Sequence, residues 1–135
     1  MKEQEQIALV EKTIAKLCGW KLVEGSLVCY TKDSGATYTT KTPSYYTDLN
    51  ACWDMEHTLR PPQTKEWDTW NRYFAFIEYF IGRDDSVHAT AALKCKAFLW
   101  VHNVDLLNLS IWDYGNPMPS DEQIKHIVEN TEKTN

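Results

Sequence analysis

The residue types that most often carry chemistry are dispersed along this chain of 135 residues. The histidines are His57, His88, His102 and His126, and the cysteines are Cys18, Cys29, Cys52 and Cys95. No histidine has a second ligand three or four residues away of the kind a zinc site uses, and no cysteine pair shows CxxC spacing. A GxSxG motif and a glycine-rich phosphate loop are also absent from the sequence. We therefore expect no metal, no cofactor and no catalytic activity.

A predicted helix that begins after Thr90 offers a different chemistry, the binding of an anion. The first turn of a helix has unpaired backbone N–H groups and the positive end of the helix dipole, so phosphate binds well there. Lys94 and Lys96 follow soon after Ala91 and add positive charge. We expect phosphate at the Ala91 end with Lys94 or Lys96. The alternative is that Thr90 only caps the helix and the lysines are solvated.

Aromatic side chains provide candidates for stacking on a nucleobase. Trp70 and Phe74 lie in a segment rich in aromatic residues, and Arg72 beside them could pair with a phosphate. Their helical spacing also fits a core or a helix–helix interface. Asn50 could contact a ligand or another subunit, although a helix N-cap at Thr47 or Asp48 explains this polar segment fully and is the safer account.

Hydrophobic periodicity and turn residues define the elements that position these side chains. The predicted helices are 4–17, 48–59, 66–81, 91–101 and one that starts at Ser120. The predicted strands are a hairpin at 20–30 and a short strand at 86–88, and 106–112 is strand-like. The polar segment 32–44 is either an extended strand pair, which its Thr and Tyr residues favour, or a mobile loop. Residues 66–81 are compatible with a strand only if both of its faces are apolar, which favours the helix.

Composition limits the classes of function. The net charge of −5 argues against a protein that binds duplex nucleic acid, because such binding needs a basic face. No apolar run approaches the roughly 20 residues that span a bilayer. The six Trp and seven Tyr residues suit either a Trp-heavy core or contacts with a ligand or another subunit. The unpaired cysteines and the charged N-terminal residues predict reduced thiols in a cytosolic protein.

Three segments in order resemble the phage ABA-sandwich family. They are Leu17-Cys18-Gly19-Trp20, Tyr45–Ala51 with its Asp-Leu-Asn-Ala sequence, and His88–Leu99, which opens with Ala-Thr and ends in Ala-Phe-Leu. The similarity covers about residues 5–102. We therefore expect an ABA-sandwich-like domain at 1–102 and a C-terminal extension with a short helix at 103–135, packed on the same domain.

The resemblance implies both a fold and a function. The fold implied is α+β, with a small antiparallel sheet packed against several helices in an αβα-type sandwich. One branch of the family, the Thoeris anti-defence 1 proteins, oligomerises and sequesters cyclic ADP-ribose isomers and cyclic oligonucleotides without cleaving them. By this resemblance the chain is a homo-oligomeric phage protein that binds such a signal in the host cytoplasm.

One departure from the family pattern and two other hypotheses leave the function open. Lys94 and Lys96 stand where relatives often have Arg or Glu, and lysine lacks the planar fork that grips phosphate in two places. A second hypothesis is an acidic, aromatic-rich phage protein that inhibits a host protein by direct binding through Trp and Tyr anchors. A nucleotide-degrading enzyme is a third reading, for which the sequence shows no metal or nucleophile constellation.

Overall fold

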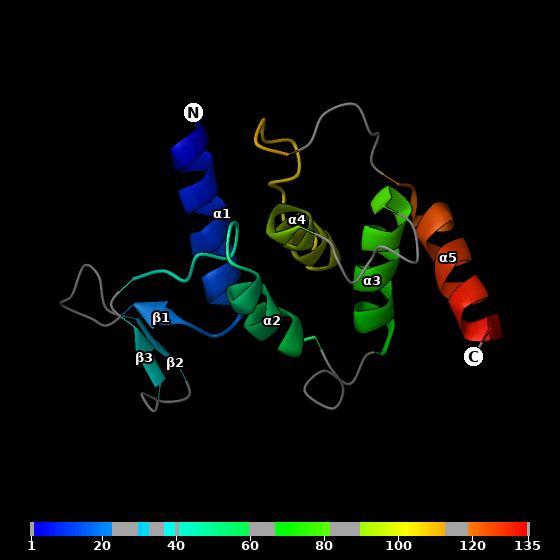
Figure 1. The fold of residues 1–135 in the computed structure, drawn as a ribbon, viewed down its shortest axis with the longest axis horizontal. Coiled ribbons are helices and arrows are strands. Elements are labelled where there is room, and N and C mark those ends of the chain that lie inside the picture. Colours follow the sequence, from blue (N-terminus) through cyan, green and yellow to red (C-terminus); the bar gives the residue numbers. More distant parts are fainter. Residues whose placement is uncertain are drawn as a thin grey trace.

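The structure is a computed structural model that describes residues 2–22, 30–32, 37–39, 41–59, 67–81, 90–112 and 119–134. The helices are α1 (Glu3–Leu17), α2 (Leu49–His57), α3 (Trp67–Ile81), α4 (Ala91–Val101) and α5 (Asp121–Thr134). The short strands are β1 (Lys21–Leu22), β2 (Tyr30–Lys32) and β3 (Thr37–Thr39). Figure 1 shows the strands beside α1 at one end of the molecule and α5 at the other.

The predicted αβα sandwich is wrong, because helices build the body of the protein. About two thirds of the interpretable residues are helical. The three strands pair antiparallel in the order β1-β2-β3, with Leu22 opposite Tyr30 and Thr31 opposite Tyr38. Strands of two or three residues are too short to form the central layer of a sandwich. The described core residues instead come from the five helices and the segments next to them.

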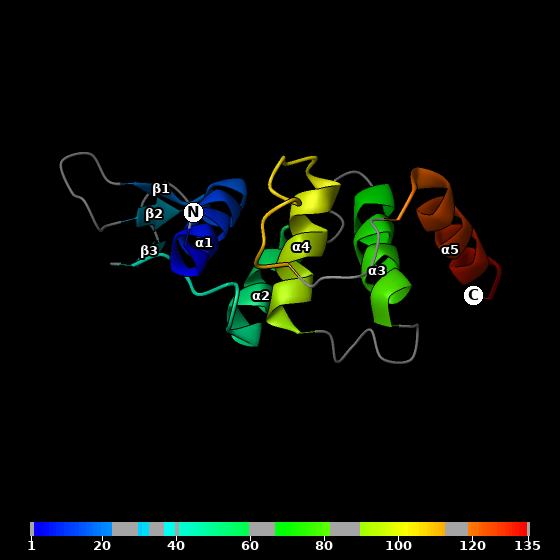
Figure 2. The same ribbon diagram turned by 90° about the horizontal axis from the view of Figure 1, so that it is seen from above.

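Helix α4 is the centre of this helical body. It contacts α1, α2 and α3, and α5 packs on the far side of α3 (Figure 2). Seven of its eleven residues are buried, which leaves it without a solvated face. A helix that is apolar nearly all round belongs inside a protein, and α4 therefore brings the other helices together.

The capping residues predicted from the sequence lie at the starts of α2, α4 and α5. The side chain of Asp48 accepts a hydrogen bond from the Asn50 N–H at 2.9 Å, and Thr90 Oγ1 accepts one from the Leu93 N–H at 3.2 Å. At α5 the Gln123 N–H donates to Ser120 Oγ, while Gln123 Oε1 accepts from the Ser120 N–H. These contacts confirm the predicted caps and the capping box.

Residues 67–81 form a helix, which confirms the preferred reading of this ambiguous segment. The predicted strand at 106–112 is wrong, because the segment consists of turns and bends in which the Trp112 Nε1–H donates to the Leu106 carbonyl at 2.7 Å. An indole that bonds to its own segment folds the chain back and competes with strand pairing. The predicted hairpin turn at 24–26 and the predicted strand at 86–88 lie outside the described residues.

The segment after residue 102 packs onto the rest of the chain. Trp112 is buried, and the Tyr46 hydroxyl donates to the Ile111 carbonyl at 3.0 Å. The Gln6 amide of α1 exchanges hydrogen bonds with the Ser110 hydroxyl. Residues of the segment 1–102 and of the segment 103–135 thus contribute to one core cluster. None of the described helices has the length and apolar character needed to cross a membrane.

Candidate functional site

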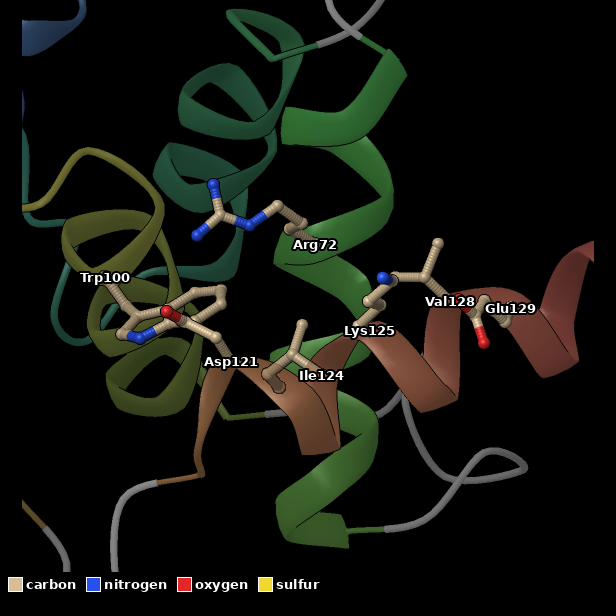
Figure 3. Close-up of a pocket in the computed structure, with 7 residues that line it drawn as sticks. All are labelled: Arg72, Trp100, Asp121, Ile124, Lys125, Val128 and Glu129. Atoms are coloured by element: carbon tan, nitrogen blue, oxygen red, sulfur yellow. The ribbon is translucent and has the colours of Figure 1, made fainter.

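A cavity of about 480 Å³ lies between α3, α4 and α5. It is lined by Arg72 from α3, Trp100 from α4, and Asp121, Ile124, Lys125, Val128 and Glu129 from α5 (Figure 3). Its volume falls in the range of small-molecule sites in proteins. We refer to it as the Arg72 cavity.

Arg72 and Trp100 are in contact with each other in the lining of this cavity. The Arg72 guanidinium lies over the Trp100 ring, with Cζ 4.7 Å from the ring centroid. Trp100 also packs against Phe76, with ring centroids 4.9 Å apart and planes inclined by 33°. Stacking of a guanidinium uses its flat face and leaves its in-plane N–H donors for an acceptor. Among the described residues, Arg72 forms no ion pair.

Helix α5 contributes a stripe of charged residues to the cavity. Asp121, Lys125 and Glu129 follow at intervals of four, so they lie along one side of the helix. No ion pair joins these three residues to one another or to Arg72, although all four are in the described part of the chain. The cavity therefore presents two cations and two carboxylates that do not neutralise each other by direct contact.

The lysines of the predicted anion site have different surroundings. Lys94 Nζ pairs with Glu56 Oε1 of α2 at 2.8 Å, with 14% and 9% of the two side chains exposed. Lys96 is buried, and its Nζ lies 4.6 Å from the centroid of the Phe80 ring. Both ammonium groups therefore already have a partner within the protein.

A smaller cavity of about 190 Å³ lies at the start of α4. Thr90 and Lys96 line it together with the apolar side chains of Phe80, Ile81, Ala92, Leu93 and Trp112. Ala91, the residue after Thr90, is buried but is not in the lining of this cavity, and neither is Lys94. The structure thus brings two of the four predicted residues of the anion site to one mainly apolar hollow.

Of the remaining predicted residues, Arg72 lines the larger cavity, whereas Trp70, Phe74 and Asn50 are in the lining of neither. Trp70 and Phe74 are half-buried and pack edge to face, with centroids 4.7 Å apart. Arg72 is two positions from Trp70, about 200° around the helix, so it lies on a different face of α3 from this pair. Asn50 is exposed on α2, where its backbone N–H serves the Asp48 cap.

The buried polar groups among the described residues include no activated nucleophile. The Cys52 thiol donates to the Tyr45 carbonyl at 3.0 Å. A hydrogen bond in which the Cys95 thiol donates to Cys52, together with burial, raises the pKa of Cys95 well above its usual value, which keeps it protonated and unreactive. Burial also raises the pKa of Tyr73 and lowers the pKa of His102. The described residues contain no group of three His, Cys, Asp or Glu that could hold a metal ion.

Of the seven described residues that line the Arg72 cavity, only Arg72 was predicted from the sequence as a site residue. The other six are Trp100, Asp121, Ile124, Lys125, Val128 and Glu129. The spacing of four between the charged residues of α5 was a visible signal, but only contact with α3 and α4 makes it part of a cavity.

No family model, no curated protein and no solved structure matches this chain.

Proposed function

We propose that this protein binds and sequesters a small nucleotide without cleaving it, and that the ligand occupies the Arg72 cavity. The observation that carries this proposal is the Arg72 guanidinium, which is held on Trp100 and forms no ion pair with any described residue. A guanidinium held in this way is ready to grip a phosphate with two parallel N–H···O bonds.

The rest of the lining supports the same class of ligand. Lys125 adds a second positive charge for a phosphate, while Ile124 and Val128 offer apolar surface to a sugar or base. The protonated, buried Cys95 thiol does not favour covalent chemistry. A binding role without cleavage is therefore the simpler function.

The resemblance described above makes cyclic ADP-ribose isomers and cyclic oligonucleotides the first ligands to test. In that case the chain is a phage protein that acts in the host cytoplasm as a homo-oligomer. A bound signal held by charge-assisted hydrogen bonds would be withdrawn from its receptor in proportion to the concentration of this protein.

Calorimetric titration tests the proposal directly. The purified protein is titrated with cyclic ADP-ribose isomers, cyclic di- and trinucleotides and 5′-mononucleotides, and the recovered ligand is analysed by mass spectrometry. We expect binding of at least one intact nucleotide. In Arg72→Ala we expect an affinity loss of about 2 kcal/mol, because a charge-assisted hydrogen bond is removed.

Lys16→Ala is the matched control, because Lys16 is an exposed cation of α1 at the opposite end of the molecule from α5 (Figure 1). It should leave the affinity unchanged. Absence of binding across the panel, or equal affinities of wild type and Arg72→Ala, would refute the proposed site. Recovery of a cleaved ligand would show an enzyme instead.

One observation favours a second candidate function, direct inhibition of a host protein. Leu49 and Trp53 of α2 are 54% and 57% exposed and lie four residues apart, with the His57 ring 3.7 Å from the Trp53 ring. Exposed tryptophans are frequent anchors of protein interfaces. Copurification of a host protein that is lost in Trp53→Ser, with no nucleotide released by heating, would support this function over sequestration.

A further inference from the structure

Asp121 is an exposed residue in the lining of the Arg72 cavity. It is the first residue of α5, directly after the reciprocal hydrogen bonds between Ser120 and Gln123. A capping box fixes the backbone at the start of a helix, and an aspartate side chain has few rotatable bonds. Figure 3 shows Asp121 and Arg72 extending toward Trp100 from α5 and α3.

The Asp121 carboxylate is not neutralised by the cations of the cavity. Neither Arg72 nor Lys125 forms an ion pair with it, and all three residues are described. An ionised carboxylate has two acceptor oxygens and no donor. A ligand group that meets it well must therefore offer two neighbouring N–H donors and no acceptor between them.

Among the common nucleobases, only guanine has such an edge. Its N1–H and its exocyclic N2–H₂ lie side by side and can bond to both oxygens of one carboxylate. Adenine and cytosine place a ring-nitrogen acceptor beside their amino group, and uracil places its single N–H between two carbonyl oxygens. Each of these three bases would bring a lone pair against the negative charge.

We infer that Asp121 makes the Arg72 cavity selective for guanine nucleotides. The guanine edge bonds to Asp121 beside Trp100, while the phosphate bonds to the Arg72 guanidinium. This inference rests on the proposed nucleotide-binding function and adds the class of base that the ligand carries. Within the ligands named above it favours cyclic oligonucleotides that contain guanine over cyclic ADP-ribose isomers, which carry adenine.

Titration with three 5′-mononucleotides tests the inference. Guanosine, inosine and adenosine monophosphates share the phosphate and the sugar, and inosine differs from guanosine only by the missing 2-amino group. We expect guanosine monophosphate to bind about tenfold more tightly than the other two, because only guanine forms a bidentate pair with the carboxylate. In Asp121→Asn this preference should disappear while the affinity for adenosine monophosphate does not fall.

Glu122→Gln is the matched control. Glu122 is exposed, lies next to Asp121 in the first turn of α5 and is not part of the cavity lining. Both variants remove one negative charge at the same helix end, so they change the long-range electrostatics and the helix dipole alike. The control should keep the full guanine preference, and circular dichroism should show equal helix content in both variants.

The outcomes separate the two proposals. Equal binding of the three nucleotides that is lost in Arg72→Ala would overturn the guanine inference and leave the nucleotide-binding function intact. A guanine preference that persists in Asp121→Asn would overturn the role of Asp121. Failure of every nucleotide to bind would overturn the proposed function together with the inference.

Discussion

The two ends of α4 have similar residue types but use them differently. At the Thr90 end, Lys94 is paired with Glu56 and Lys96 lies over Phe80, beside a small and mainly apolar cavity. At the Trp100 end, Arg72 is stacked on the indole but forms no ion pair with a described residue, beside a cavity more than twice as large. The ion pair with Glu56 occupies the donors of Lys94, whereas contact with the Trp100 ring leaves the in-plane N–H donors of Arg72 for a ligand.

The largest expected effect is on stability at the Thr90 end. Lys94→Met should lower the free energy of unfolding by about 3 kcal/mol, because it leaves the Glu56 carboxylate buried without its cation. Urea denaturation measures this change. The double variant Lys94→Met with Glu56→Leu should recover most of the loss, since an apolar pair of similar volume often replaces a buried ion pair at little cost. A single variant as stable as wild type would mean that the pair is not structural.

At the Trp100 end, Trp100→Leu should lower the free energy of unfolding by about 2 kcal/mol. The indole is half-buried and packs against Phe76 and Arg72. Its replacement therefore removes less buried apolar surface than replacement of a fully buried tryptophan. Thermal and urea unfolding provide the measurement. Trp53→Leu makes the same change at an exposed site and should be nearly neutral; a larger cost there would place Trp53 in an interface.

The cap of α4 gives a smaller expected change. Thr90→Ala should cost about 1 kcal/mol, because the Leu93 N–H loses its hydrogen bond to Thr90 Oγ1. Thr47→Ala is the matched control at an exposed position that caps no helix. If Thr90→Ala also weakened nucleotide binding, the smaller cavity would have to share in the ligand site, and the contrast between the two ends would be weaker.

The smallest expected effect concerns pH and His102, which follows α4 at the Trp100 end. Its Nε2 is buried without a partner among the described residues, and burial lowers its pKa below 6.5. The unfolded state therefore binds more protons as the pH falls through about 6.5, and stability should decrease there until the folded-state pKa is passed. As the pH is lowered from 7.5 to 5, the urea midpoint of the wild type should fall more than that of His102→Gln, so the difference between the two midpoints changes toward acid pH.

The wild-type curve alone does not isolate His102. Burial raises the pKa of Glu11 above 4.5, which stabilises the folded state as the pH falls, and so has the opposite sign. Because both proteins contain Glu11, the difference between their curves reports on His102. Parallel curves would show that the His102 ring takes up its proton equally well in the folded state.

Predictions that depend on local structure succeeded. Asp48, Thr90 and Ser120 mark helix starts because a short polar side chain bonds to the N–H groups of the next turn, wherever the helix later packs. The apolar residues of 67–81 recur at helical spacing, whereas a strand would place them on both of its faces. The pattern therefore predicts the helix that the structure has. The prediction of an αβα sandwich was wrong, because residue types that favour strands in 20–44 do not determine how many strands assemble or whether they cover a core.

The sequence alone determined the helices, their caps and the position of each charge along them, because these depend on residues within one or two turns. The tertiary structure decided what each charge does. Glu56 and Lys94 are 38 residues apart in sequence, yet their contact uses the lysine that was expected to hold phosphate. The meeting of Arg72 with Trp100, and of both with α5, likewise depends on how α3, α4 and α5 pack. Side-chain desolvation and pairing are set by such distant neighbours, which local patterns do not encode.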